Sequence, residues 1–302
     1  MIVGFIGFGE AASSIALGLR GEGIDRMVCY DAMQDDERMS EIMKERVAAC
    51  QGEKAESAAA VCRKSDVVIS AVPSNYAVSA AEDAAAGIKE GQLFLDVSTA
   101  TPIEKKKISE MVKARGGLLI DGAMMGALLK SKHQVPMLLS GDGAKAFRDK
   151  MEPYHMCLEV VEGEAGTATS IKFIRSITAK GLSCLLIESL QAAQRFGVEQ
   201  TIVDSFVDTF GPEFIGIING YVSGAIIHAE RREHELKNVV DFLQSEMLPY
   251  TMAEATRTKL QWLADHHVKD NFESGVARDW KKVLEGWKLY HIPVNVFKRR
   301  SE

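Results

Sequence analysis

The amino end of the chain constrains its fold most, because a buried strand there leads directly into a helix. Residues 2–6 are apolar apart from Gly4, and Gly7 ends this run. An alanine-rich amphipathic run begins at Glu10. Between these elements the chain follows the spacing Gly-x-Gly-x-x-Ala, with Gly7, Gly9 and Ala12. The pattern predicts the first strand, turn and helix of a βαβ unit.

Each residue of this turn suits the binding of a dinucleotide. Gly7 permits the tight turn, Gly9 lets the backbone approach a pyrophosphate, and Ala12 allows close packing of helix on strand. The amides and the positive dipole end of the helix also favour phosphates. We therefore expect a cofactor-binding segment made of Gly7, Phe8, Gly9, Glu10 and Ala11.

An acidic residue at the end of the second strand indicates the type of cofactor. Residues 26–30 are expected to form a strand that ends at Asp31, 22 residues after Gly9. A carboxylate about 20 residues after the glycines accepts the ribose hydroxyls of NAD and repels the extra phosphate of NADP. The alternative is a plain βαβ unit with a solvated aspartate. We expect NAD, with NADP left open.

Strands alternate with helices as far as Glu162, which predicts an α/β fold with a mainly parallel, doubly wound sheet. The chain is helical in character after Gly166, where residues 170–196 form a long apolar pattern typical of a buried helix. The prediction is a Rossmann-type domain over residues 1–164 and an all-α domain over residues 165–302. Strands are expected at 2–6, 26–30, 67–72, 92–96, 118–121, 135–140 and 158–161, and helices at 35–50, 54–63, 76–88, 102–115, 144–151, 170–196, 200–209, 212–227, 249–266 and 280–289, with a charged helical run through Gln244.

Ligands in an open α/β sheet collect at the carboxyl ends of the strands. In this chain these ends carry small or polar residues, which suit a nicotinamide ring. The residues expected there are Val72, Pro73, Ser74 and Asn75 after the third long strand, Ser98 and Thr99 after the fourth, and residues 121–126 after the fifth.

Composition excludes several classes of partner. The net charge is −6, and Lys105–Lys107 and Arg231-Arg232 are short basic runs, typical of solvated helix faces, so nucleic acid is not expected.

The five cysteines are scattered, which predicts neither a disulfide framework nor a metal site and fits a reducing cytoplasm. We expect no targeting segment, and no apolar run of about 18 residues is found, so we expect a cytoplasmic protein that does not bind membranes.

Lys172 is the candidate for acid–base chemistry. It lies near the start of the long helix, just after a glycine-containing link at residues 163–166. Apolar surroundings lower the pKa of a lysine amine, which supplies a base near neutral pH. By spacing alone a solvated lysine is the commoner outcome.

Several segments together resemble the β-hydroxyacid dehydrogenases, which include 3-hydroxyisobutyrate dehydrogenase and enzymes similar to 6-phosphogluconate dehydrogenase. They are residues 2–20, Ser98-Thr99 with Pro102, residues 121–126 and residues 166–172, in that order. Residues 135–144 and Arg231-Arg232 further resemble a branch with a C-terminal domain of unknown function, DUF1932. The resemblance implies a homodimer with the active site between domains. It also implies that Lys172 is the catalytic lysine, that Ser98 and Thr99 lie beside the nicotinamide, and that Ser74 and Asn75 lie along the cofactor.

The chain departs from the family pattern at positions that contact substrate. Met125 replaces a serine that binds the substrate carboxylate, and Ser176 replaces an asparagine. A Lys-Asp pair corresponds loosely to His234-Glu235. The expected substrate contacts are therefore Ser98, Met125, Gly126, Ser176 and His234, although an exposed helical histidine is the commoner outcome. Arg231 and Arg232 fit an anion clamp, a solvated face or a dimer salt bridge equally well.

The sequence thus predicts an oxidoreductase that moves a hydride between a nicotinamide cofactor and a small, anionic hydroxy acid or related alcohol. Two alternatives stay open. One is an imine reductase, although those enzymes usually replace the lysine; the other is a dinucleotide-binding sensor without turnover.

Overall fold

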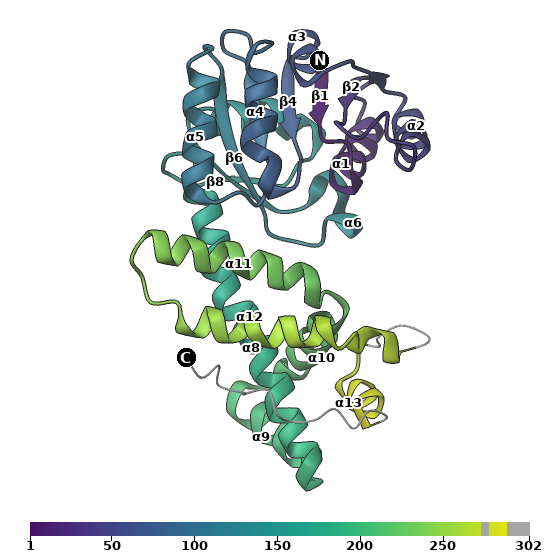
Figure 1. Ribbon diagram of the computed structural model, residues 1–302, viewed down its shortest axis with the longest axis vertical. Coiled ribbons are helices and arrows are strands. Elements are labelled where there is room, and N and C mark those ends of the chain that lie inside the picture. Colours follow the sequence, from purple (N-terminus) through teal and green to yellow (C-terminus); the bar gives the residue numbers. More distant parts are fainter. Residues whose placement is uncertain (273–277, 289–302) are drawn as a thin grey trace. The chain divides into compact units, whose positions relative to one another are not determined.

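The computed structural model describes residues 1–272 and 278–288 (Figure 1). The chain divides into two compact units, Met1–Ile174, here called the α/β unit, and Arg175–Glu302, here called the helical unit.

The α/β unit contains one eight-stranded sheet in the order β3-β2-β1-β4-β5-β6-β7-β8. Neighbouring strands are parallel except for β6 and β7, which are antiparallel. The expected mainly parallel, doubly wound sheet is confirmed. The strands are β1 (Ile2–Ile6), β2 (Arg26–Tyr30), β3 (Glu53–Lys54), β4 (Val67–Ser70), β5 (Leu93–Asp96), β6 (Leu118–Met124), β7 (Met137–Ser140) and β8 (Leu158–Val160).

Helices cover both faces of this sheet, because its central strands have buried apolar side chains on both sides. One core cluster packs β-strand residues against Ile15 and Leu19 of α1 and Phe147 of α7. The other packs them against Val61 of α3 and Ile108 of α5. Figure 1 shows α4 and α5 side by side over the sheet. The helices are α1 (Glu10–Gly21), α2 (Ser40–Ala49), α3 (Ala58–Lys64), α4 (Ala77–Ala85), α5 (Pro102–Lys113), α6 (Leu128–Ser131) and α7 (Ala144–Met151), with short 3-10 helices η1 (Ser74–Tyr76), η2 (Lys132–Gln134) and η3 (Glu152–Tyr154).

The strand register aligns the carboxyl ends of the central strands in one row. Ile6 pairs with Tyr30 on one side and with Ser70 on the other. Ser70 pairs with Asp96, and Asp96 pairs with Asp121. The segments that follow β1, β2, β4, β5 and β6 therefore leave the sheet at one edge. Between β1 and β4 the chain order reverses, which is where an open α/β sheet forms its ligand crevice.

Two helices start later in the chain than expected. Ser57 accepts a hydrogen bond from the Ala60 amide at 3.2 Å and starts α3 at Ala58, so Lys54 belongs to edge strand β3 instead of the expected helix. Helix α2 starts at Ser40, because residues 34–39 form turns.

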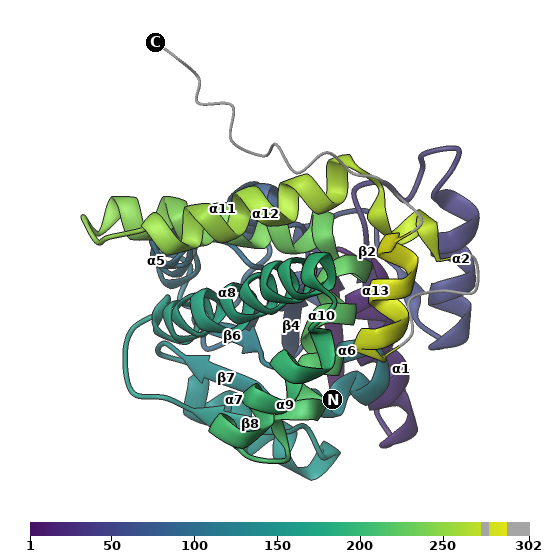
Figure 2. The same ribbon diagram turned by 90° about the horizontal axis from the view of Figure 1, so that it is seen from below.

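The helical unit consists of the greater part of α8 and the helices that follow it. They are α8 (Thr167–Phe196), α9 (Glu199–Phe210), α10 (Phe214–Ile227), α11 (Ala229–Ser245), α12 (Thr251–Asp265), η4 (Val268–Asn271) and α13 (Trp280–Lys288). Figure 2 shows α11 and α12 side by side, as Figure 1 does. Leu289, expected at the end of the last helix, lies outside the described residues.

Helix α8 belongs to both units. The sequence sets the domain boundary at residue 164, and the two compact units divide after Ile174, within α8. The helix is not buried all round, since Leu185 is 54% exposed while Leu186 and Leu190 are buried. No helix in the described part of the chain has the length and apolar character needed to cross a membrane.

Candidate functional site

The turn after β1 requires a glycine at position 7. Gly7 has φ +76°, and its amide donates to the Tyr30 carbonyl at 2.9 Å. A Cβ at this position would lie 2.6 Å from Val72 Cγ1 and 3.0 Å from the Ala71 carbonyl oxygen. The turn therefore packs tightly between the ends of β2 and β4, as expected of Gly7.

Gly9 and the start of α1 fit the phosphates of a dinucleotide. A Cβ on Gly9 would have no atom within 4 Å, so the backbone there is open to a ligand. Gly9 is also the N-cap of α1, and it provides no side-chain cap for the first amides. Ala12 is fully buried against the sheet. Uncapped amides at the positive end of a helix bind phosphate well.

The other residues of this segment contribute in different ways. The Phe8 ring is 1% exposed and packs edge-to-face on Phe5, with ring centroids 5.6 Å apart. Phe8 therefore offers a ligand its backbone alone. Glu10 and Ala11 occupy the first turn of α1, where the Glu10 side chain is exposed.

Asp31 reaches the glycine turn from the end of β2. Its Oδ2 accepts the Phe8 amide at 2.7 Å, and its Oδ1 accepts the Met33 amide at 2.9 Å. Each carboxylate oxygen has two acceptor sites, so this half-buried group can still accept ribose hydroxyls. Arg46, on α2, donates to the Phe8 carbonyl at 3.5 Å. A carboxylate and a guanidinium therefore both contact the turn.

The segments after β4 and β5 lie along the same edge. The Ala71 amide donates to the Ile6 carbonyl, which joins the start of the Val72–Asn75 segment to the end of β1. Pro73 and Asn75 are exposed, while Val72, Ser74 and Thr99 are half-buried. Ser98 is buried, and its hydroxyl donates to Asp96 Oδ2 at 2.9 Å. In this structure Ser98 thus stabilises the turn after β5.

A buried ion cluster holds β5, β6 and α5 together at this edge. Lys105 Nζ lies 3.0 Å from Asp96 Oδ2 and 3.3 Å from Asp121 Oδ1, and it donates to the Asp96 carbonyl at 2.8 Å. Burial alone lowers the pKa of the Lys105 amine, but the two carboxylates outweigh it and raise the pKa above its ordinary value. The expected solvated face at Lys105–Lys107 is wrong for Lys105, which is 0% exposed.

Asp121 also anchors the first turn of α8. Its Oδ2 accepts the amides of Gly166 and Thr169, each at 3.0 Å, and its Oδ1 accepts the Thr169 hydroxyl at 2.6 Å. The Ser140 hydroxyl, which donates to Asp121, accepts the Ala168 amide at 3.0 Å. Lys172 follows on this anchored helix within the α/β unit and is half-buried.

The expected substrate contacts fall in both units. In the α/β unit, the Met125 amide donates to the Pro136 carbonyl at 2.7 Å, and Gly126 is exposed. In the helical unit, Ser176 accepts a hydrogen bond from Lys180 Nζ at 3.0 Å. His234 has a 72% exposed side chain, as expected of a solvated histidine, and its Nδ1 lies 2.9 Å from the Glu230 carbonyl.

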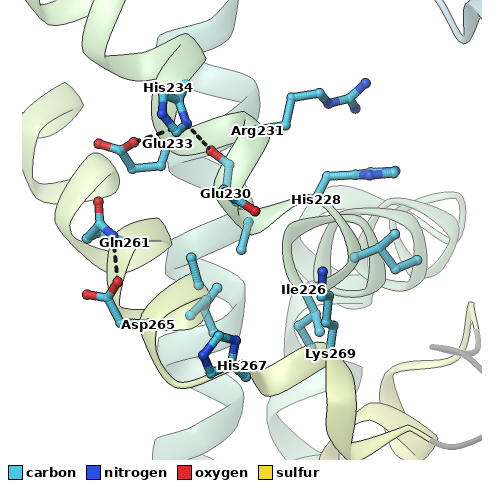
Figure 3. A pocket seen from close by; sticks show the side chains of 14 residues that line it. Ile226, His228, Glu230, Arg231, Glu233, His234, Gln261, Asp265, His267 and Lys269 are labelled. Carbon is cyan, nitrogen blue, oxygen red and sulfur yellow. Dashed lines mark hydrogen bonds and ion pairs between the residues drawn. The ribbon is translucent and has the colours of Figure 1, made fainter. Parts of the chain in front are cut away.

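A pocket of about 630 Å³ lies in the helical unit, lined by α10, α11, α12 and η4 (Figure 3). His228, His234 and His267 line it together with Arg231 and Lys269. Two of its carboxylates have other partners, since Glu233 pairs with Arg257 at 3.1 Å and Asp265 accepts from Gln261 at 2.7 Å. The described residues contain no group of three or more histidine, cysteine or acidic side chains suited to a metal. All five cysteines are free.

Sequence reasoning missed Asp96, Lys105 and Thr169. A signal for Lys105 exists, because it shares the helical spacing of Ile108 and Val112 on the buried face of α5. An apolar face that includes a lysine indicates a buried partner, and Asp96 and Asp121 end the two neighbouring strands. No local pattern marks Thr169, since its partner Asp121 is 48 residues away.

Two family models match the chain. The model of the NAD binding domain of 6-phosphogluconate dehydrogenase matches residues 2–154. The model of a domain of unknown function, DUF1932, matches residues 193–263. Together they cover parts of both units.

Individual relatives agree with these matches. An uncharacterized 28.5 kDa protein of Methanothermus fervidus is 25% identical over 265 residues, which are 88% of this chain and 100% of that protein. Mouse mitochondrial 3-hydroxyisobutyrate dehydrogenase is 31% identical over 130 residues, 42% of this chain and 36% of that enzyme.

Solved structures extend the likeness to nearly the whole chain. A conserved hypothetical protein from Sinorhizobium meliloti 1021 has a TM-score of 0.79 and 30% identity, covering 95% of each chain. Mycobacterium tuberculosis 3-hydroxyisobutyrate dehydrogenase, solved with L-serine, has a TM-score of 0.72 over 95% of this chain and 99% of its own. At 15% identity, the latter likeness concerns the fold alone.

Proposed function

Because the chain belongs to the β-hydroxyacid dehydrogenase superfamily, in the branch with a DUF1932 C-terminal domain, we propose that it oxidises or forms a small hydroxy acid with a nicotinamide cofactor. Its α/β unit has the NAD-binding fold of 3-hydroxyacid dehydrogenases. The substrate and the catalytic residue are the parts that we propose.

The cofactor is held by backbone and by one carboxylate in this proposal. The open amides at Gly9 and the first turn of α1 receive the pyrophosphate, and Asp31 receives the ribose hydroxyls. NAD is preferred to NADP, because Asp31 contacts the turn at 2.7 Å while Arg46 reaches it only at 3.5 Å. The nicotinamide ring, when bound, supplies a hydride acceptor, or a donor in the reverse direction.

Lys172 is the general base in the oxidation. Its amine takes the hydroxyl proton of the substrate as the carbonyl bond forms and the C–H electron pair leaves as hydride. In the reduction, the same ammonium returns the proton to the developing alkoxide. A positioned group of this kind contributes about 10²–10⁴-fold to the rate.

The observation that carries the proposal is the anchoring of α8 at the sheet edge that holds the glycine turn. Asp121 lies in the same register row as Ile6, Ser70 and Asp96, and it caps the helix that carries Lys172. A base that acts beside a hydride acceptor must be held in a fixed position, because a small displacement lowers the rate by a large factor. The anchored start of α8 provides such a position for Lys172.

Turnover with purified protein tests the proposal. The protein is incubated with NAD or NADP and a panel of small hydroxy acids, alcohols and imines, and nicotinamide absorbance is followed. We expect oxidation of a hydroxy acid, faster with NAD, and a loss of about 10²–10⁴-fold in kcat for Lys172→Ala. Lys106→Ala removes an exposed lysine of the same unit and should keep the rate.

The other outcomes identify the alternatives. Reduction of imines without oxidation of hydroxy acids would identify an imine reductase. Tight binding of NAD without turnover of any compound would favour a sensor. A homodimer is part of the proposal, and light scattering of the purified protein tests it.

A further inference from the structure

The side chains around Ser176 surround a position where a substrate contact is expected. The family resemblance places a substrate contact at position 176, where this chain has a hydroxyl in place of an amide. In the helical unit this hydroxyl accepts from Lys180, one turn further along α8. The polar contact at position 176 is thus linked to a cation.

Lys180 belongs to a cluster of charged residues contributed by α8 and α11. Its residue exposure is 9%, and its Nζ lies 3.0 Å from Glu235 Oε2. Arg231 Nε lies 3.8 Å from the other oxygen of the same carboxylate. Burial lowers the pKa of the Lys180 amine despite Glu235, and Arg232 and Arg231 lower it further.

Arg232 is the third cation of this cluster. Its Nη1 is buried and has no hydrogen-bond partner among residues 1–272 and 278–288. The guanidinium fits against α10 at Gly224, where a Cβ would lie 2.8 Å from Nη2. Burial lowers the pKa of Arg232, and the attraction of Glu235 does not restore it.

Positive charges outnumber negative charges in this cluster. Lys180 and Arg232 face the one carboxylate of Glu235 from positions with little solvent, while the Arg231 side chain, which also approaches Glu235, is 66% exposed. Buried charges and buried N–H groups are costly unless an opposite charge or an acceptor meets them. An anion bound beside Lys180 and Arg232 would supply both.

We propose that Lys180 and Arg232, with the hydroxyl of Ser176, form the subsite for an anionic group of the substrate, a carboxylate or a phosphate. A guanidinium and an ammonium together suit either group, because both present several acceptor oxygens. Glu235 holds the Lys180 amine in place and limits the net charge of the subsite. This inference rests on the proposed function and names the substrate class for it.

Binding of small anions to the whole protein tests the subsite without any turnover. Malonate represents a carboxylate ligand, inorganic phosphate a phosphate ligand, and malonamide an uncharged control of similar shape. We expect calorimetry to show binding of malonate or phosphate but not of malonamide. The anion that binds more tightly indicates the chemistry of the natural group.

Variants locate the binding. Arg232→Met and Lys180→Met should each weaken anion binding by at least about tenfold, since each removes a charge-assisted contact. Lys237→Met is the matched control, because it removes one exposed positive charge from the same helix, and it should bind as the wild type does.

Thermal stability separates this role from a structural one. Without an anion, Arg232→Met should melt at or above the wild-type temperature, because it removes a half-buried cation whose buried Nη1 has no hydrogen-bond partner in the described part of the chain. Added malonate or phosphate should then stabilise the wild type but not the variant. A variant that melts lower and still binds the anion with wild-type affinity would overturn the proposal, as would a wild type that binds neither anion.

The outcome is independent of the proposed reaction. Anion binding that depends on Arg232, in a protein that turns over no hydroxy acid, would refute the dehydrogenase and keep the subsite. Turnover that depends on Lys172 but is unchanged in Arg232→Met and Lys180→Met would keep the dehydrogenase and refute the anion subsite.

Discussion

At the scale of single residues, Asp121 joins the sheet to α8, because it accepts three hydrogen bonds from the start of that helix. It also forms an ion pair with Lys105. The buried cluster has two carboxylates for one lysine. The amino end of α8 supplies the missing positive charge, because its amides and dipole point at Asp121. The Asp121 carboxylate therefore caps the start of α8, and the same helix end stabilises its negative charge.

Removal of Lys105 should therefore be costly. Lys105→Met leaves Asp96 and Asp121 facing each other without a cation, and such a loss typically costs about 3–5 kcal/mol. We expect urea unfolding to show that decrease in the free energy of unfolding. Lys106→Met, at the exposed neighbouring position, should change it by less than about 0.5 kcal/mol. Equal effects of the two variants would show that the buried pairs contribute nothing specific.

The two glycines of the first turn should respond differently to alanine. Gly7→Ala forces a left-handed φ on alanine and a 2.6 Å contact with Val72, so it should destabilise the fold by about 1–3 kcal/mol. Gly9 has φ −71° and open space at the Cβ position, so Gly9→Ala should fold as the wild type does.

Binding of NAD then distinguishes their roles. Because the added methyl group of Gly9→Ala occupies space that a pyrophosphate would approach, we expect calorimetry to show at least tenfold weaker NAD binding, about 1.4 kcal/mol. Unchanged affinity in Gly9→Ala would mean that the phosphates bind elsewhere.

At the scale of elements, local patterns predict most of the α/β unit. Apolar runs bounded by glycine or polar residues mark β1, β2, β4 and β5, and the pair Thr101 and Glu104 forms the capping box that starts α5. The two-residue β3 was not predicted, because pairing with β2 and not its own sequence makes Glu53–Lys54 a strand. The start of α2 was predicted too early, because charged residues are equally compatible with turns.

The site is predictable only where it depends on local sequence patterns. The glycine turn and Asp31 are local signals with fixed spacing, and in the structure the Phe8 amide of the turn donates to the Asp31 carboxylate. The burial of Lys105 and the anchoring of α8 depend on contacts between residues far apart in sequence, which composition does not reveal. Arg232 looks like half of an exposed basic pair, and only its contact with α10 shows that the residue is half-buried and its Nη1 atom buried.

The end of α1 provides a prediction about pH. Glu22, the C-cap of α1, lies 2.7 Å from Nδ1 of His155, after η3, and 3.3 Å from Nε2 of His133, in η2. The hydrogen bond with His155 is the main reason that the pKa of Glu22 lies below its ordinary value of 4.5. A lowered carboxyl pKa adds stability above the ordinary value, and this stability disappears as the pH falls through the lowered pKa.

Glu22→Gln should therefore melt below the wild type at weakly acidic pH above 4.5, where the Glu22 carboxylate is ionised. The difference should shrink as the pH falls below 4.5. Melting curves of both proteins across this range check the prediction, with Glu41→Gln, which removes an exposed carboxylate of α2, as the control. A difference that grows toward lower pH would have the wrong sign.

At the scale of the whole molecule, α8 is the element common to both units. Its first turn is capped by Asp121 in the α/β unit, and its later turns bury Leu186, Ile187 and Leu190 in the helical unit. The three tryptophans, Trp262, Trp280 and Trp287, all belong to the sequence of the helical unit. Tryptophan fluorescence therefore reports the unfolding of one unit, while NAD binds the other in our proposal.

Helix formation is cooperative, so loss of the capped first turn should weaken the turns that follow it. We expect NAD to raise the midpoint of the tryptophan-detected transition, although no tryptophan lies in the unit that binds it. At a hundredfold excess over its Kd, NAD stabilises the state that binds it by about 2.7 kcal/mol. Gly9→Ala should show no such rise at the same NAD concentration. If circular dichroism shows part of the helix content stabilised by NAD while the fluorescence midpoint stays fixed, the two units unfold independently and α8 does not couple them.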